Sequence, residues 1–216
     1  MRVIAIDGPA GSGKSSVAQA LAARLGLEYL DTGAMYRAVT FAVLRAGGDP
    51  SDSGFTAAVA RTIDVRVTGE RVLVDGVDAT VEIRSPSVDR AVSVVAANAE
   101  VRAEMVARQR EWARRRDGGV VEGRDIGTVV FPEADLKVYL KADPDVRALR
   151  RARQSGALDH TAEAGAVESV AADLARRDTI DSTRQAGPLS VASDAVVIDT
   201  TEKTFDETIE QILGLV

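Results

Sequence analysis

The sequence predicts an α/β fold in which helices cover both faces of a five-stranded parallel sheet, giving three layers. Two observations predict this architecture. Short, predominantly apolar runs recur along the chain, and segments with the 3.6-residue periodicity of amphipathic helices lie between them. The chain has 216 residues, of which 45% are hydrophobic, and it is therefore long enough to bury one sizeable core.

The first predicted elements are a strand, a glycine-rich loop and a helix. The strand is an apolar run at residues 3–6, and the helix at residues 15–25 places Val17 and Leu21 on one face before Gly26 ends it. Four further apolar runs follow along the chain. We expect the five core strands at residues 3–6, 28–30, 120–122, 136–140 and 195–198.

Residues 63–84 differ from the rest of the chain. Val65, Val67, Val72 and Val74 alternate with polar residues, and glycines supply turns between them, which is typical of a small antiparallel sheet. Helical sequence follows to about residue 116, with a break near Asn98. A capping box at residues 204–207 opens a C-terminal helix.

Composition narrows the class of protein. The net charge of −6 gives the molecule as a whole no attraction for nucleic acid. The absence of cysteine excludes disulfides, thiolate zinc sites and cysteine nucleophiles. No apolar run approaches the ~20 residues of a membrane span, and the first residues do not read as a secretory signal. We therefore expect a cytoplasmic protein that binds neither nucleic acid nor a membrane.

The stretch GPAGSGKSS, at residues 8–16, carries the clearest functional signal. It matches the P-loop pattern GxxxxGK[ST] and lies between a predicted strand and a predicted helix. Backbone N–H groups of such a loop converge on phosphate oxygens, the lysine reaches the β- and γ-phosphates, and the serine can ligate Mg²⁺. The alternative, a glycine-rich turn without function, does not explain both flanking elements. We expect a nucleoside triphosphate to contact Gly8, Pro9, Ala10, Gly11, Ser12, Gly13, Lys14, Ser15 and Ser16.

A P-loop is shared by switches, motors, pumps and kinases. A guanine-nucleotide switch would need an NKxD sequence to bind its base, and the chain has none. A small kinase needs a second site that holds an anionic acceptor beside the γ-phosphate. Four arginine-bearing stretches could build such a site, because ligands of open parallel sheets gather at the carboxyl ends of the strands. They are DTGAMYR (31–37), residues 91–110, VVEGRDIGTVVFP (120–132) and RRDTIDSTR (176–184).

Together these stretches resemble the bacterial cytidylate kinases, which are P-loop nucleoside-monophosphate kinases. GRDIGTVVFP and DTGAMYR carry the resemblance most specifically, and it extends over essentially the whole chain. It implies one domain with a nucleotide-binding core at about residues 1–35, 117–146 and 170–216. The monophosphate-binding region with its β insert would then span about residues 36–116, and a short helical lid about residues 147–169.

The resemblance also implies roles for individual residues. It assigns the acceptor phosphate to Thr32, Arg37, Arg124, Arg177 and Arg184, the ribose hydroxyls to Asp181, and the base to Ser93, Arg102 and Asp125. The chemistry of cytosine agrees with this assignment. Its O2 and N3 are acceptors for a serine and an arginine, and its amino group is a donor for a carboxylate. Uracil reverses the polarity at N3 and at position 4 and would leave the same groups mispaired.

Arg147 and Arg151 lie four residues apart and therefore share one helix face. In the family that the chain resembles, arginines of the lid close over the transferring phosphoryl group, so we expect Lys14, Arg147 and Arg151 to be catalytic. Residues 155–168 contain few basic residues, which departs from the family pattern and leaves open which lid arginines reach the nucleotide. His160, the only histidine, is expected to be solvated.

Glu122 ends a predicted strand before a glycine, at the Walker-B position. We expect Ser15 to ligate Mg²⁺ directly and Glu122 to do so through water. A structural carboxylate that bonds the P-loop is the alternative for Glu122. Plain alternatives exist for the other candidates too: a solvated arginine for Arg37, Arg147 or Arg151, a charged helix face for Arg102, a turn cap for Asp181 and an ordinary small helix residue for Ser93.

The sequence thus predicts transfer of the γ-phosphoryl group of ATP to CMP or dCMP, with Mg²⁺, by a protein that we expect to be monomeric. No general base is expected, because the acceptor phosphate is already ionised at neutral pH and catalysis depends on positioning and charge stabilisation. Two other classes remain open. One is a P-loop kinase for another acceptor, such as UMP or shikimate, and the other is a nucleotide-dependent binding module without turnover.

Overall fold

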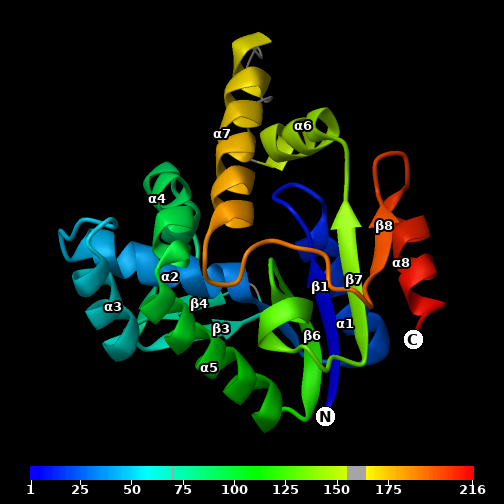
Figure 1. The fold of residues 1–216 in the computed structure, drawn as a ribbon, viewed down its shortest axis with the longest axis horizontal. Coiled ribbons are helices and arrows are strands. Elements are labelled where there is room, and N and C mark those ends of the chain that lie inside the picture. The colour runs from blue at the N-terminus through cyan, green and yellow to red at the C-terminus, as the bar shows by residue number, and fades with distance from the viewer. Residues whose placement is uncertain (70, 155–163) are drawn as a thin grey trace.

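The computed structural model describes residues 1–69, 71–154 and 164–216 (Figure 1). Its main sheet has five parallel strands in the order β2-β6-β1-β7-β8. The strands are β1 (Arg2–Asp7), β2 (Tyr29–Asp31), β6 (Gly118–Gly123), β7 (Leu136–Lys141) and β8 (Val196–Asp199). The five predicted strands and the predicted fold class are therefore confirmed.

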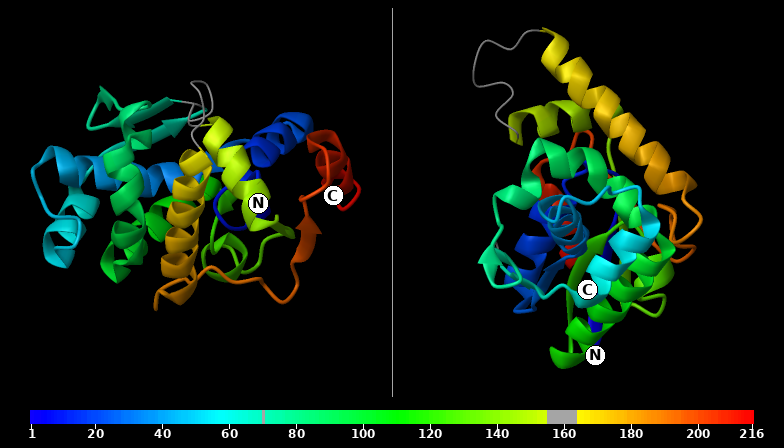
Figure 2. Two further views of the ribbon diagram at one scale, coloured as in Figure 1. Left: turned by 90° about the horizontal axis from the view of Figure 1, so that it is seen from above. Right: turned by 90° about the vertical axis from the view of Figure 1, so that its left-hand side faces the viewer.

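The sheet is covered on both faces because alternate side chains of its strands are apolar in both directions. In β1, Val3 and Ala5 belong to the core shared with α2 (Thr32–Arg45) and α5 (Ala99–Arg115). Ile4 and Ile6 belong to the opposite core, shared with α1 (Lys14–Leu25) and α8 (Phe205–Leu213). The result is the three-layer arrangement visible in Figures 1 and 2.

A second, antiparallel sheet lies beside α2. Its strands are β3 (Val65–Thr68), β4 (Arg71–Val74) and β5 (Val77–Asp78), in that order, which confirms the predicted β insert. The helix α3 (Ser53–Thr62) precedes the insert, and η1 (Glu82–Arg84) and α4 (Pro86–Ala97) follow it. The predicted break at Asn98 is also confirmed, because the Asn98 side chain accepts the N–H groups that begin α5.

Two helices rise from the carboxyl ends of the sheet strands, α6 (Pro144–Gln154) and α7 (Ala164–Thr183) (Figure 1). Helix α7 runs without interruption across residue 170, at which the predicted lid ends and the core resumes. Residues 155–163 of that lid, including His160, lie outside the described residues, and the division into core, insert and lid stays a prediction. None of the described helices combines the length and apolar character of a membrane span.

The connection after β6 is a π-helical turn, η2 (Ile126–Val130), which the sequence analysis did not predict. The buried carboxylate of Asp7, at the end of β1, accepts the N–H groups of Ile126 and Gly127, each at 2.8 Å. Burial raises the pKa of Asp7 to about 6, although these two hydrogen bonds act against the shift. Asp7 therefore ties the strand that leads into the glycine loop to the turn that follows Arg124 and Asp125.

Candidate active site

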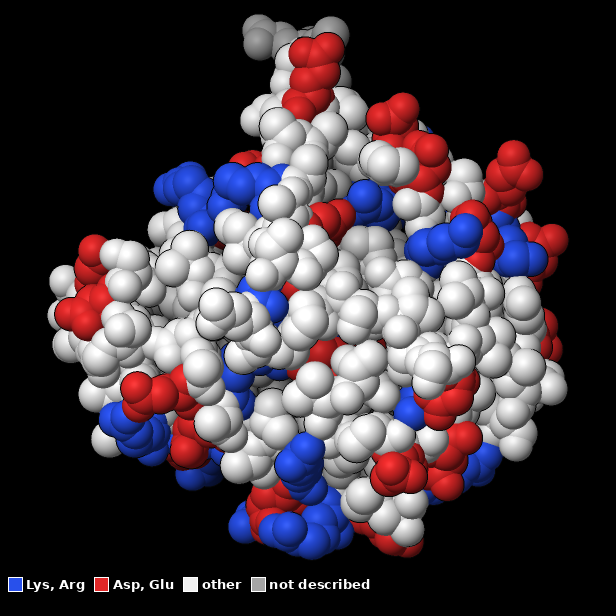
Figure 3. Space-filling model, in the orientation of Figure 1, with Lys and Arg blue, Asp and Glu red and all other residues white. Residues whose placement is uncertain are grey.

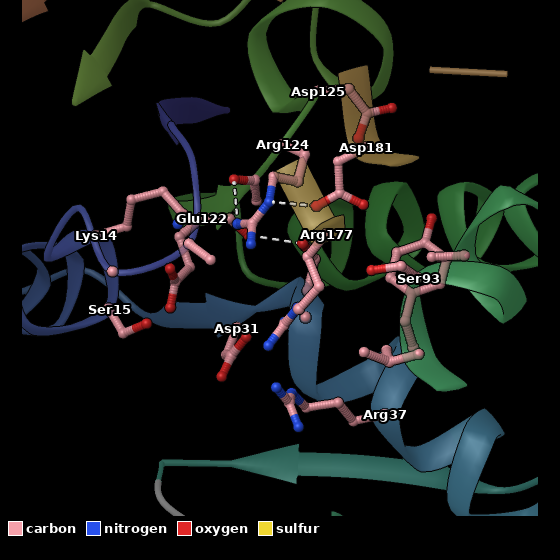
Figure 4. Close-up of a pocket in the computed structure, with 18 of the residues that line it drawn as sticks. Lys14, Ser15, Asp31, Arg37, Ser93, Glu122, Arg124, Asp125, Arg177 and Asp181 are labelled. Atoms are coloured by element: carbon pink, nitrogen blue, oxygen red, sulfur yellow. Dashed lines mark hydrogen bonds and ion pairs between the residues drawn. The ribbon is translucent and has the colours of Figure 1, made fainter. Parts of the chain in front are cut away.

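A cavity that is partly open to solvent lies at the carboxyl ends of β2 and β6 (Figure 4). Most of the predicted site residues meet in its walls, although they come from widely separated parts of the chain. They are Ala10, Gly11, Lys14, Ser15, Thr32, Arg37, Ser93, Glu122, Arg124, Asp125, Arg151, Arg177, Asp181 and Arg184. A second cavity shares Gly11, Lys14, Ser15 and Arg151 with the first and is also lined by Ser12, Gly13 and Ser16. The glycine loop therefore lies between the two cavities.

The backbone of residues 8–13 requires glycine at three points, and at Gly11 the φ is 76° and an added Cβ would lie 2.9 Å from the carbonyl oxygen of Arg147. Gly13 precedes α1 with a φ of 90°, in the left-handed region, and presents no side chain to the first turn of the helix. A Cβ on Gly8 would lie 2.1 Å from the carbonyl oxygen of Leu140. The loop can therefore lie close to β7 and leave the N-terminus of α1 accessible to an anion.

Lys14 is buried where the loop meets the cavity. Its ammonium group donates to the carbonyl oxygen of Pro9 at 2.9 Å. Burial lowers the pKa of Lys14 to about 7, and the neighbouring Arg124 lowers it further, while Glu122 and Asp7 act in the opposite direction. A phosphate group bound here would provide a negative counter-charge beside this buried ammonium.

Glu122 lies at the end of β6 in register with Asp31 of β2. The Tyr29 hydroxyl donates to Glu122 Oε1 at 2.5 Å. Burial raises the pKa of Glu122, and Asp31 raises it further, whereas Lys14, Tyr29 and Ser15 act against the shift. The buried Glu122 and the partly exposed Asp31, beside a serine hydroxyl, form a hard oxygen donor set that a divalent cation would stabilise, and this fits Mg²⁺.

Two predicted acceptor-site arginines are paired with Asp181 on α7. Arg124 Nε donates to Asp181 Oδ2 at 2.9 Å, and Arg184 lies 3.6 Å from Asp181 Oδ1. Arg184 also donates to the carbonyl oxygen of Gly187 at 2.7 Å. The end of α7 and the loop after it thus hold both guanidiniums at the cavity wall.

Three more guanidiniums converge on one carboxylate, that of Asp89 on α4. Arg37 and Arg177 contact its Oδ1, at 2.5 and 3.5 Å, and Arg151 contacts its Oδ2 at 2.7 Å. Burial lowers the pKa of Arg177 to about 10, with a further contribution from the nearby positive charges of Arg37 and Arg124. Figure 4 shows the ends of Arg37 and Arg177 pointing toward each other in the cavity. The group therefore has more positive charge than Asp89 neutralises.

The residues expected to recognise the base lie at the other end of the cavity. Asp125 forms a buried ion pair with Arg102, and Arg184 lies 3.6 Å from its other oxygen. Ser93 is also buried and lines the cavity. Arg102 lies behind Asp125, where it stacks over the Tyr36 ring at 5.5 Å, and it is not among the residues of the cavity wall.

Arg147 lies beside the glycine loop and not in either cavity wall. Its guanidinium donates to the carbonyl oxygens of Ala10 and Ala142 and forms an ion pair with Asp178. The backbone N–H of Ala10 donates to the same Asp178 at 3.3 Å. Arg147 and Asp178 therefore hold both peptide groups of Ala10, and the catalytic role expected of Arg147 stays a prediction.

Sequence reasoning missed several residues of this site. Asp31, Arg84 and Tyr36 line the cavity, and Asp7, Asp89 and Asp178 hold other site residues in place. Asp31 and Asp7 had a local signal, because each ends a strand directly before a predicted phosphate-binding segment. Asp89 and Asp178 had none, since their partners lie far away in the sequence.

A P-loop that faces a buried group of arginines across one cavity defines a phosphotransferase with an anionic acceptor, that is, a P-loop kinase. Comparison with known proteins narrows this class. The sequence model of the family described as cytidylate kinase matches residues 4–216. The chain belongs to the cytidylate kinase family.

Curated relatives agree with this assignment. The chain is 49% identical over 218 residues to a cytidylate kinase of Mycolicibacterium paratuberculosis, covering 99% of this chain and 94% of the relative. It is also 49% identical over 221 residues to a cytidylate kinase of Nocardia farcinica, with 99% and 93% covered. A solved structure of an uncharacterized protein from Eubacterium ventriosum aligns with all of this chain and 98% of its own at a TM-score of 0.52. Its sequence identity is 13%, so this likeness concerns the fold alone.

Proposed function

We propose that the two sides of the cavity divide the substrates of a cytidylate kinase, which phosphorylates CMP or dCMP with ATP. The glycine loop holds the triphosphate, and the arginines of α2, of α7 and of the segments directly after β6 and α7 hold the acceptor phosphate. The observation that carries the proposal is the excess of positive charge around Arg177, in the wall of the same cavity as Lys14.

On the donor side, the free N–H groups at the start of α1 and the Lys14 ammonium bind the phosphates of ATP. Ser15 and, through water, Glu122 would hold Mg²⁺, with the remaining ligands supplied by phosphate and water. The described residues contain no cluster of three or more side chains that could hold a metal unaided. When bound, the ion neutralises charge that develops on the phosphate oxygens.

On the acceptor side, Arg124 and Arg184 hold the monophosphate close to Lys14, with Arg37, Arg177 and Thr32 around it. Asp181 accepts from a ribose hydroxyl. An acceptor oxygen already ionised at neutral pH needs no base, so the residues contribute by orienting two anions that would otherwise repel each other and by stabilising the charge of the transition state.

At the base end, Asp125 accepts from the cytosine amino group, and Arg102 keeps the carboxylate oriented. Ser93 provides a hydroxyl toward the base. Uracil would present its O4 acceptor to the Asp125 carboxylate, acceptor against acceptor, and leave a buried charge unpaired. This arrangement favours CMP over UMP.

The test is the selectivity of Asp125→Asn. The wild type is first assayed for ADP formation from ATP with CMP, dCMP, UMP, AMP and shikimate, to establish its acceptor range. The asparagine amide can donate to O4, so we expect the ratio of kcat/KM for CMP to that for UMP to fall by about 10- to 100-fold, mainly through lost activity on CMP. An equal loss on both substrates would show that Asp125 does not recognise the base.

A further inference from the structure

On the acceptor side, Asp89 is a carboxylate that several arginines contact at once. It lies in the first turn of α4, and its half-buried carboxylate receives Arg37 from α2, Arg151 from α6 and Arg177 from α7. In the described part of the chain it is the one carboxylate that these three guanidiniums contact. A single side chain thereby joins three helices at the edge of the phosphate site.

The contacts use both carboxylate oxygens in the way that a phosphate would. Arg37 and Arg177 share Oδ1, and Arg151 takes Oδ2. Burial raises the pKa of Asp89, but the three arginines outweigh it, so that its pKa lies below the ordinary value and the group is ionised at neutral pH. The carboxylate therefore competes for the same donors as any anion that enters.

The Asp89 carboxylate alone does not provide hydrogen-bond acceptors for all the N–H groups of these guanidiniums. Arg177 Nε is buried and has no hydrogen-bond partner among the described residues. Three positive charges face one negative charge, which leaves room for a dianion. A phosphate that bound Arg37 and Arg177 would be repelled by the Asp89 carboxylate, which is also negative and contacts the same two guanidiniums.

We propose that Asp89 is an internal competitor of the substrate: its carboxylate occupies the phosphate-binding guanidiniums of the free enzyme, and the acceptor phosphate must displace it. The proposal rests on the proposed function of Arg37 and Arg177. Asp89 thereby lowers the affinity for CMP in the free enzyme and keeps the three clustered arginines from facing one another without a counter-charge.

The opposite role is that Asp89 only orients the arginines or stabilises the start of α4, where an acidic residue favours the helix dipole. The two roles predict opposite changes in phosphate affinity when Asp89 is replaced. Removal of a competitor strengthens binding of the phosphate, whereas removal of an orienting group weakens it.

The experiment measures the Kd of CMP, of cytidine and of inorganic phosphate by calorimetry, for the wild type and for Asp89→Asn. If the Asp89-bound arrangement holds about 90% of the free enzyme, removal of the competitor lowers the Kd of CMP about tenfold; we expect a decrease of about 3- to 10-fold. Inorganic phosphate should gain affinity too, and cytidine should change less than about twofold. The matched control is Asp145→Asn on α6, an exposed carboxylate that, like Asp89, lies in the first turn of its helix. It should leave all three Kd values unchanged.

An unchanged or higher Kd of CMP in Asp89→Asn overturns the proposal. A thermal melt checks each fold, and Asp89→Ser, which also suits the first turn of a helix, replaces the asparagine variant if that variant is unfolded. Arg177→Ala separates the two levels of inference. If that variant binds CMP and cytidine as well as the wild type does, the proposed function of the arginines fails. If it loses CMP but Asp89→Asn gains none, only the role of Asp89 fails.

Discussion

The two sides of the cavity, which we propose to hold the donor and the acceptor, present different groups to a phosphate. On the donor side, one continuous stretch, residues 8–16, presents backbone N–H groups and the end of a helix. On the acceptor side, side chains from α2, β6, α6 and α7 converge, each held by a carboxylate such as Asp89 or Asp181. Basic and acidic side chains also lie in small mixed groups on the face shown in Figure 3.

This difference determines how sensitive each side of the cavity is to substitutions. A backbone site depends mainly on the local geometry of the loop, which here is also held by Arg147 and Asp178. A side-chain site depends on ion pairs between separate elements, so that each charge is balanced by another and removal of one affects its neighbours. The single lysine on the donor side is the exception, because backbone groups cannot supply a full positive charge.

The largest effect is expected from Lys14→Ala. The loop keeps its shape, because glycines and the contact of Arg147 with Ala10 hold it, but the charge on the transferring phosphoryl group is no longer stabilised. We expect kcat to fall about 10²- to 10³-fold, the size of effect seen when a charge-stabilising group is removed. Steady-state ADP formation measures this, with a thermal melt to verify the fold. CMP binding should be preserved, and a well-folded variant with near-normal turnover would exclude the glycine loop as the donor site.

A smaller effect is expected on the acceptor side from Arg124→Ala and Arg184→Ala. Hydrogen bonds to charged groups contribute about 1.5–3 kcal/mol each, so the KM for CMP should rise by roughly 10- to 150-fold. The Kd of cytidine, which lacks the phosphate, should change far less. Equal losses for CMP and cytidine would show that these arginines do not hold the phosphate and would remove the contrast between the two sides.

The smallest effect concerns the electrostatic link between the sides. The pKa of Lys14 is lowered to about 7 by burial and by Arg124, so that the ammonium is largely deprotonated at pH 8 in the free enzyme. ATP favours the charged form, so binding at pH 8 should take up a proton, and ATP affinity should fall about fivefold from pH 7 to pH 8.

Calorimetry of ATP binding at pH 8, in buffers of different ionisation enthalpy, measures this proton uptake. Arg124→Ala removes a cause of the lowered pKa of Lys14 and should reduce the uptake. Asp206→Asn, which changes an exposed charge in the first turn of α8, is the control and should leave the uptake as it is. A proton count of zero in the wild type would contradict the lowered pKa of Lys14.

The fold was predictable because its signals are local. Each core strand is a short apolar run, Asn98 and Thr204 cap helices with their own side chains, and the alternating valines of residues 65–74 need only their immediate neighbours to form a hairpin. The π-helical turn after Arg124 was not predictable in this way. It depends on hydrogen bonds to Asp7, which lies 119 residues from Ile126 in the sequence.

The sequence by itself determined the donor side, since a strand, a glycine loop, Lys14 and a helix follow one another without interruption. Through the resemblance of GRDIGTVVFP and DTGAMYR to cytidylate kinases, it also predicted which arginines hold the acceptor, and that assignment stays a prediction. Only the tertiary structure decided that Arg37, Arg151 and Arg177 share Asp89 and that Arg102 lies behind Asp125. The physical reason is that ion pairs between distant residues leave no periodic pattern along the chain, because packing of the helices on the sheet alone brings those charges within reach of one another.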